Sequence, residues 1–298
     1  MAEQLCRVSP AIELCYETFG IPSDPTALMI MGLGTQMIAW PDELCESLAA
    51  RGFHVVRFDN RDAGRSTHIP GPPPTPGQLI RRSRRAAHYL LSDMARDAAG
   101  LLRELDLAPA HVVGASMGGM IGQTLAARHP DSVRSLTSIM STTGGRWVGQ
   151  PSPWLYPIFL RRPGAGREAS IERTVKIFAA IGSRGLPQDL DAIREVAGRS
   201  WDRDHDPRGP GRQLAAILAS GDRTEELRRI SVPTVVIHGT DDRLVSPSGG
   251  RATARAIPGA KLLKIEGMGH DLPRAAWQRM LDAIAQTAAL AEPVREPA

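Results

Sequence analysis

Short apolar runs alternate with segments of helical period from about residue 27 to the end of the chain. Such an alternation predicts the α/β class, in which helices cover both faces of a mostly parallel, twisted sheet. The expected strands are residues 27–31, 54–58, 111–113, 136–140, 234–238 and 261–265. An earlier segment, residues 12–19, alternates apolar with polar side chains and predicts an antiparallel strand at the edge of the sheet.

The alternation is interrupted once, from residue 144 to residue 229. This stretch contains no clear buried strand, but it is rich in proline and glycine and includes helix-like pieces at residues 171–181 and 214–218. An insertion of this size between two core strands predicts a mostly helical cap. Residues 1–143 and 230–298 would then form one α/β core domain, and residues 144–229 its cap.

The composition is that of a protein which buries a full hydrophobic core. Of its 298 residues, 42% are hydrophobic and 23% are charged. No apolar run approaches the roughly 18 residues that span a bilayer. The first residues also lack the basic start and apolar centre of a signal peptide. We therefore expect a cytoplasmic protein that does not interact with membranes.

The polar residues argue against nucleic-acid or metal partners. The chain has 36 basic and 32 acidic residues, dispersed along its length, and a net charge of +4. Its one basic cluster, residues 81–85, follows a proline-rich loop and is expected to be solvated. The three cysteines are odd in number and have no C-x-x-C spacing, so they suggest neither a disulfide framework nor a zinc site. We expect no metal, no cofactor and no nucleic-acid partner, and the sequence makes no prediction of oligomeric state.

The strongest local motif is a G-x-S-x-G pattern formed by Gly114, Ser116 and Gly118. An apolar strand precedes it and a helix-forming stretch, residues 120–128, follows it. A strand, this motif and a helix together are typical of a nucleophile elbow, in which a strained turn holds the serine hydroxyl clear of the sheet. Glycine is expected at both flanking positions because the turn leaves no room for their side chains. Ser116 is therefore the candidate nucleophile.

A serine nucleophile needs a histidine base that is oriented by an acid, and in this architecture the chain order is Ser, acid, His. The strand at residues 261–265 leads into a glycine-flanked loop that ends at His270. Of the eight histidines, only His270 combines the right order with such a loop and a preceding strand. The strand at residues 234–238 leads into two adjacent acids, Asp241 and Asp242, and either is a candidate from its position alone.

These motifs, taken together, resemble those of the α/β-hydrolase superfamily. Residues 59–66, Asp-Asn-Arg-Asp-Ala-Gly-Arg-Ser, are similar to the D-x-R-G-x-G-x-S turn of that family, with Asp62 in place of its first glycine. Arg61 is expected to brace this turn rather than to bind substrate. The segments at residues 31–34, 40–42, 61–66 and 267–270 look especially like those of bacterial carboxylesterases related to aclacinomycin methylesterase.

The resemblance also implies roles for single residues. Residues 239–245 resemble the pattern G-x-x-D-x-x-V, which assigns the acid to Asp242 and leaves Asp241 as a neighbour. The family usually has His-Gly-x on the loop after the first parallel strand, and Met31, Gly32 and Leu33 take that place here. Leu33 is thereby the implied donor of one oxyanion-hole N–H group.

The second oxyanion donor is expected to be Met117, because it follows the nucleophile and starts a helix whose N-terminus points its amides at the developing charge. An apolar acyl pocket is expected near Met31, Gly32, Met37 and Trp40, although packing in the core explains the three large side chains equally well.

The expected activity is hydrolysis of carboxylic esters of small or medium apolar substrates through an acyl-enzyme. Serine at the elbow disfavours haloalkane dehalogenases and epoxide hydrolases, which use aspartate there. The alternatives are a cofactor-free perhydrolase, a lactonase or a C–C bond hydrolase of the same fold, because the cap and pocket decide among them. A triad-bearing ligand receptor is a further alternative. The only partner expected is a small-molecule ester substrate.

Overall fold

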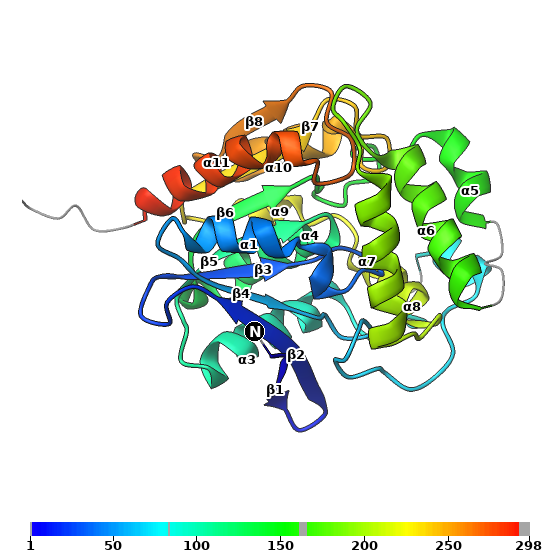
Figure 1. Ribbon diagram of the computed structural model, residues 1–298, viewed down its shortest axis with the longest axis horizontal. Coiled ribbons are helices and arrows are strands. Elements are labelled where there is room, and N and C mark those ends of the chain that lie inside the picture. The colour runs from blue at the N-terminus through cyan, green and yellow to red at the C-terminus, as the bar shows by residue number, and fades with distance from the viewer. Residues whose placement is uncertain (1, 83, 161–165, 292–298) are drawn as a thin grey trace, which may run out of the picture.

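The computed structural model describes residues 2–82, 84–160 and 166–291 of the chain (Figure 1). Its centre is an eight-stranded sheet in the order β1-β2-β4-β3-β5-β6-β7-β8. The pairs β1/β2 and β2/β4 are antiparallel, and all other neighbours are parallel. The strands are β1 (Gln4–Ser9), β2 (Ile12–Phe19), β3 (Thr26–Ile30), β4 (His54–Phe58), β5 (Ala110–Ala115), β6 (Val133–Ile139), β7 (Thr234–Gly239) and β8 (Lys261–Ile265).

The sheet matches the sequence prediction except at one edge. Strand β2 is antiparallel as expected, but the prediction that it forms the sheet edge is wrong, because β1 pairs outside it. Strand β1 was not expected, because this six-residue strand buries only two side chains, Cys6 and Val8, while Leu5 is exposed. A single strand of this kind gives little periodic signal.

Helices cover both faces of the sheet and enclose two hydrophobic clusters. Side chains of α3 and α4 pack with β1, β2 and β5 in the first cluster. Those of α1 and α11 pack with β3, β7 and β8 in the second. The helices of the core are α1 (Asp42–Ala49), α2 (Pro76–Ile80), α3 (Leu91–Glu104), α4 (Met117–Arg128), α10 (Pro247–Ala256) and α11 (Trp277–Ala289). Short 3-10 helices are η1 (Met37–Ala39), η2 (Pro130–Ser132), η3 (Pro153–Leu155) and η4 (Arg274–Ala276).

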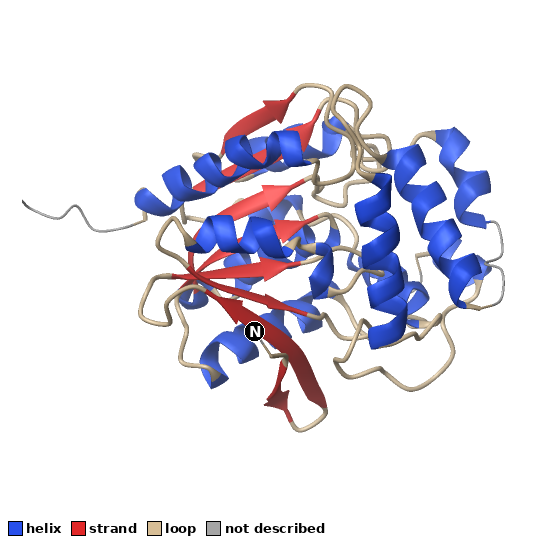
Figure 2. Cartoon of the chain, in the orientation of Figure 1, coloured by secondary structure: helices blue, strands red, loops and turns tan. Residues whose placement is uncertain are grey.

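The segment between β6 and β7, for which we keep the name cap, carries helices and no strand in its described residues. Residues 161–165 of the expected cap lie outside the described part of the chain. The helices are α5 (Tyr156–Leu160), α6 (Arg167–Ile181), α7 (Leu190–Arg203), α8 (Gly209–Ser220) and α9 (Thr224–Leu227). Figure 2 shows the parallel strands pointing their carboxyl ends toward the side of the molecule where α5 to α8 stand. Sites of doubly wound sheets form at that end of the strands.

Two buried ion pairs join the cap to the turn that follows β4. Arg203, at the end of α7, donates to Asp59 at 2.9 Å. Arg212, in α8, donates from two nitrogens to the two carboxylate oxygens of Asp62 at 3.0 and 2.6 Å. Asp62 occupies the position where the family turn has glycine, and its φ of 65° lies in the left-handed region. The departure from the family pattern therefore supplies the carboxylate that Arg212 binds.

The turn is also braced from the core side. The guanidinium of Arg61 donates to both carboxylate oxygens of Asp97 in α3, at 2.6 and 2.7 Å. This bidentate pair agrees with the structural role expected for Arg61.

No helix of the described residues is long and apolar enough to cross a bilayer. All three cysteines, Cys6, Cys15 and Cys45, are buried free thiols. Arg81, Arg82, Arg84 and Arg85 of the basic cluster are exposed, as expected, and residue 83 lies outside the described part of the chain. The cytoplasmic location stays a prediction.

The buried pair between Arg212 and Asp62 predicts a large effect on stability. In Arg212→Met, the carboxylates of Asp62 and Asp206 lose the guanidinium group that pairs with both of them. We expect a loss of about 3–5 kcal/mol in the free energy of unfolding, measured by urea denaturation, because a buried charge is left without its partner.

Arg208→Ala is the matched control, since the exposed Arg208 side chain also pairs with Asp206. We expect that variant to lose at most about 1 kcal/mol, the usual upper range for an exposed ion pair. Equal losses in the two variants would show that burial of the Arg212 pair contributes nothing.

Candidate active site

Ser116 lies at the turn between β5 and α4 in a strained backbone conformation. Its φ is 56° and its ψ is −117°, a combination that residues with a side chain adopt rarely and at a cost in free energy. The turn is held because the Ser116 amide donates to the carbonyl of Ile139 at 2.9 Å. The hydroxyl consequently stands at the N-terminus of α4, above the carboxyl ends of the strands.

The two glycines of the motif are required by close backbone contacts. A Cβ atom on Gly114 would lie 2.2 Å from the carbonyl oxygen of Gly118. A Cβ atom on Gly118 would lie 1.9 Å from the carbonyl oxygen of Ile30, at the end of β3. Both distances are far inside van der Waals contact, so only glycine fits either position. The spacing of the motif thus follows from how tightly α4 packs on β5 and β3.

His270 lies next to the serine. Its Nε2 atom is 3.0 Å from Ser116 Oγ, which is within hydrogen-bond reach. The loop that carries the ring is held by the end of α6 in the cap, since His270 N–H donates to the carbonyl of Ile181 at 2.9 Å. The neighbouring Gly269 N–H donates to Ser183 Oγ at 3.0 Å. Cap residues therefore help to fix the position of the imidazole.

Asp242 orients the other side of the imidazole. Its Oδ2 atom is 2.8 Å from His270 Nδ1, and its Oδ1 atom accepts from the amides of Leu244 and Val245 at 3.0 and 2.8 Å. Burial tends to raise the pKa of Asp242, but the charge of His270 and hydrogen bonds from His238 and His270 lower it to about 2. The carboxylate is therefore ionised throughout the neutral range, where it can stabilise an imidazolium.

The adjacent acid, Asp241, turns elsewhere. Its amide donates to the carbonyl of Met268 at 2.9 Å, and its carboxylate accepts from Thr240 Oγ1 at 3.4 Å. Sequence position alone did not decide which of the two acids orients the histidine. In the structure the two carboxylates have different partners, and Asp242 is the one that contacts His270.

A second histidine beside Asp242 was missed by the sequence analysis. His238 Nε2 is 2.8 Å from the carbonyl of Val245 and 3.4 Å from Asp242 Oδ2. Of the eight histidines, the sequence pattern singled out only His270. The place of His238 at the end of β7, four residues before Asp242, was the available signal.

The loop after β3 lies against the serine. A Cβ atom on Gly32 would be 3.2 Å from Ser116 Cβ and 3.7 Å from its Oγ. Asn60 holds the start of this loop, because its Nδ2 donates to the carbonyl of Met31 at 3.0 Å. Among the described residues, the amide of Leu33 donates to no backbone carbonyl and to no side chain. Leu33 and Met117 thus belong to two segments that both meet at Ser116.

The residues predicted to bind substrate are mostly buried in the core. Met31 and Trp40 belong to the hydrophobic cluster that α1 and α11 cover. Met37 is fully buried in a small cluster with Cys15 and Ile38. The structure gives these side chains a packing role, and their contact with substrate stays a prediction, as does that of Gly32.

Asp62, His68 and Asp206 are the one group of described residues whose ligand atoms lie close enough together to hold a metal ion. Arg212 already occupies this group, because its Nη2 donates to Asp62 at 2.6 Å and to Asp206 at 2.8 Å. The guanidinium supplies the positive charge that an ion would bring. The group is therefore a core–cap ion pair.

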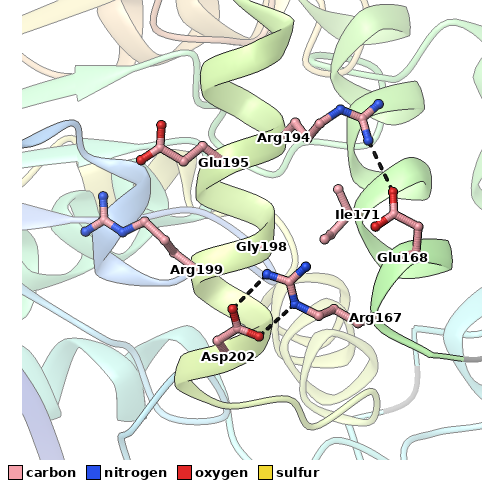
Figure 3. Close-up of a pocket in the computed structure, with 8 residues that line it drawn as sticks. All are labelled: Arg167, Glu168, Ile171, Arg194, Glu195, Gly198, Arg199 and Asp202. Atoms are coloured by element: carbon pink, nitrogen blue, oxygen red, sulfur yellow. Dashed lines mark hydrogen bonds and ion pairs between the residues drawn. The ribbon is translucent and has the colours of Figure 1, made fainter.

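A surface groove of about 330 Å³ between α6 and α7 is unrelated to these residues (Figure 3). Ion pairs line it, including Arg167 with Asp202 at 2.7 Å and Arg194 with Glu168 at 3.4 Å. Its lining residues are Arg167, Glu168, Ile171, Arg194, Glu195, Gly198, Arg199 and Asp202. None of them is a predicted site residue, and oppositely charged side chains that pair with each other offer little to an apolar ester.

Comparisons with known proteins show which family and which relatives the chain is similar to. The alpha/beta hydrolase fold family matches residues 25–273. Rhodomycin D methylesterase of Streptomyces peucetius is 31% identical over 297 residues, which cover 92% of this chain and 94% of the relative. The pimeloyl-[acyl-carrier protein] methyl ester esterase of Chromobacterium violaceum is 29% identical over 165 residues, covering 54% of this chain and 63% of the relative.

Among solved structures, the enol-lactonase of Burkholderia xenovorans LB400 superposes with a TM-score of 0.71 and 26% identity. The match covers 97% of this chain and 99% of the lactonase. The similarity therefore extends through the core and the cap.

Proposed function

The chain belongs to the α/β-hydrolase family and is a carboxylic ester hydrolase, and we propose that it works through an acyl-enzyme formed on Ser116. The observation that carries the proposal is the unbroken chain of contacts from Ser116 Oγ through His270 to Asp242, at 3.0 and 2.8 Å. An isolated serine hydroxyl is a weak nucleophile at neutral pH, and this arrangement supplies the base that it needs.

In the first half-reaction, Ser116 Oγ attacks the ester carbonyl carbon while His270 Nε2 takes the hydroxyl proton. The resulting imidazolium stays next to the ionised carboxylate of Asp242, which stabilises it and holds the proton on Nδ1. His270 then returns the proton from Nε2 to the alcohol oxygen as the ester C–O bond breaks. The alcohol leaves, and the acyl group remains on Ser116.

The negative charge on the tetrahedral oxygen is stabilised by the N–H groups of Leu33 and Met117. Met117 is the first residue of α4, where backbone amides have no acceptor within the helix. Leu33 lies on the loop that packs against Ser116. Preorganised donors of this kind are worth roughly 10²–10³ in kcat each. In the second half-reaction His270 deprotonates a water molecule, which attacks the acyl carbon and forms a second tetrahedral oxyanion that the same N–H groups stabilise. The bond from the acyl carbon to Ser116 Oγ then breaks, His270 returns the proton to Ser116 Oγ, and the carboxylic acid leaves.

The substrate class that we propose is a methyl ester of an apolar carboxylic acid, with methanol as the leaving group. Its support is that a relative aligned over 92% of this chain is named a methylesterase, and that a second relative is named a methyl ester esterase. A lactonase is the second candidate, since an enol-lactonase is 26% identical over 97% of this chain. A lactone is an internal ester, so the same acyl-enzyme steps would open it.

Ser116→Ala is expected to fold and to lose about 10⁴- to 10⁶-fold in kcat on an activated ester, because the acyl-enzyme route is gone. A fluorophosphonate probe, followed by mass spectrometry of the intact chain and of its peptides, should add one label to the wild type, at Ser116, and none to the variant. Ser47→Ala, a half-buried residue of α1, is the control and should keep wild-type activity. Labelling at another residue would rule out Ser116 as the nucleophile.

The two adjacent acids are expected to differ sharply. Asp242→Asn preserves shape but stabilises the wrong imidazole tautomer and leaves the imidazolium without a counter-charge, so kcat should fall by about 10⁴-fold. Asp241→Asn, whose side chain contacts Thr240 instead, should stay within about tenfold of wild type, or about 1.4 kcal/mol of barrier. The opposite order in steady-state kinetics would make Asp241 the orienting acid.

The substrate class is tested with two ester series. With one aromatic acid and alcohols of increasing length, kcat/KM is expected to fall at least about tenfold from methyl to butyl, since each misplaced methylene in a fitted site costs about 1–3 kcal/mol. With para-nitrophenol as the fixed alcohol, lengthening the acyl group reports the size of the acyl pocket. Faster turnover of butyl esters than of methyl esters would contradict the proposal, and preference for lactones over both would favour the second candidate.

A further inference from the structure

A glutamine of the cap reaches the loop that carries the Leu33 amide. Gln213 lies in α8 and is fully buried. Its Oε1 accepts from the amide of Gly34 at 2.8 Å, and its Nε2 donates to the carbonyl of Arg61 at 2.8 Å. A backbone N–H on one side and a backbone carbonyl on the other fix the orientation of the side-chain amide. Both ends of Gln213 are therefore used, and neither faces solvent.

The Gly34 amide is one of three successive peptide groups in this loop that are each held by a side chain. Asn60 donates to the carbonyl of Met31 at 3.0 Å, which fixes the peptide between residues 31 and 32. Thr35 Oγ1 donates to the carbonyl of Gly32 at 3.0 Å, which fixes the next peptide. Gln213 fixes the third, between Leu33 and Gly34.

The second of these peptides carries the Leu33 N–H group. The carbonyl of Gly32 and the amide of Leu33 lie in one plane and point in opposite directions. Holding the carbonyl with Thr35 therefore aims the N–H group away from Thr35. The peptide between Gly32 and Leu33 can keep this orientation only if the peptides on either side of it do not rotate. Gln213 holds the one that follows, between Leu33 and Gly34.

The conformation of Gly34 makes the orientation of the peptide between Leu33 and Gly34 depend on Gln213. The Gly34 φ of +66° is in the left-handed region, which glycine adopts about as readily as negative φ, so steric clashes alone do not fix this conformation. The Pro210 ring of α8 lies so close that a Cβ on Gly34 would be 3.2 Å from it. The first turns of α8 thus cover this glycine, and Gln213 supplies the hydrogen bond that holds it.

We propose that Gln213 is a positioning residue for ester hydrolysis: from the cap, it sets the orientation of the Leu33 N–H group that stabilises the oxyanion. The proposal rests on the function proposed above for Ser116 and Leu33. It makes the docked cap a requirement for a complete oxyanion hole. A cap whose α8 is displaced would leave Ser116, His270 and Asp242 in place and weaken only the stabilisation of the transition state.

The test is Gln213→Met, which keeps the length and volume of the side chain and removes both hydrogen bonds. We expect kcat to fall roughly 10- to 100-fold, the range for a misplaced or lost oxyanion donor, with KM within about threefold of wild type. The affinity for phenylboronic acid, whose tetrahedral serine adduct places a charged oxygen in the hole, should fall by about the same factor as kcat/KM.

Gln123→Met is the matched control. Gln123 is also fully buried, and its amide donates to Ser138 Oγ at 2.9 Å and accepts from Arg223 at 2.8 Å. Loss of these bonds should lower the melting temperature of the protein by a similar amount while leaving kcat and boronate affinity within about threefold of wild type. A Gln213→Met variant that behaves like this control, with lower stability and unchanged kcat, would overturn the proposal.

Gln213→Glu is the second variant and also serves if Gln213→Met does not fold. It keeps an oxygen that accepts from the Gly34 amide, and its second carboxyl oxygen can donate to the Arg61 carbonyl only while this buried group is protonated, the form that burial favours. Its kcat should therefore lie between those of the wild type and Gln213→Met, and a kcat below that of Gln213→Met would contradict the proposal. If Gln213→Met does not fold, kcat of Gln213→Glu should be reduced with unchanged KM, and wild-type kcat would contradict the proposal.

Fluorophosphonate labelling separates this inference from the one on which it rests. If the proposed function is wrong, the wild type is not labelled at Ser116. If only the role of Gln213 is wrong, the wild type and both Gln213 variants are labelled at Ser116 and all have the wild-type kcat.

Discussion

The contact between Gly118 and the end of β3 is the constraint on which the rest of the site depends. With no side chain at Gly118, the first turn of α4 approaches the carbonyl of Ile30 more closely than any Cβ would allow. The same approach forces Ser116 into its strained conformation and brings the loop after β3 against its hydroxyl. The strained backbone of Ser116 and the closeness of the Leu33 loop to its hydroxyl thus both follow from the close approach of α4 to β3. A bulkier residue at Gly118 would disturb both together.

A second constraint comes from charges buried between the core and the cap. Asp59 and Asp62, three residues apart in one turn, each receive an arginine from the cap. Asp62 adopts a positive φ that glycine would adopt at less cost, of order 1–3 kcal/mol for such a residue. The carboxylate that results binds Arg212, Tyr89 and the amide of Ile69. Breaking such a buried network is costly because each charge left behind is unpaired, so the cap is held in one place on this turn.

The sequence predicted the site residues that lie just after strands. It missed those that depend on contacts between residues far apart in the chain. Ser116 and His270 each follow a strand of the sheet, β5 and β8, where the order of elements alone indicates a role. The choice of Asp242 over Asp241 needed a family resemblance, because a loop of irregular backbone gives no periodic signal for which side chain turns inward. Strand β1 and Gln213 were missed for different reasons: β1 buries too few side chains, and Gln213 meets Gly34 across 179 residues of sequence.

The cap contributes contacts on both sides of Ser116. These contacts limit which changes in the cap sequence leave the site unaltered. On one side its Ile181 carbonyl and Ser183 hydroxyl hold the loop of His270. On the other side Gln213 holds the loop of Leu33. If a cap only enclosed the substrate, substitutions in it would alter the substrate specificity and nothing else. With the roles proposed for Ser116, Leu33 and Gln213, this cap also orients peptide groups next to the reacting atoms. Changes in its helices that shift these residues are then expected to alter the rate of the chemical step as well as the choice of ester.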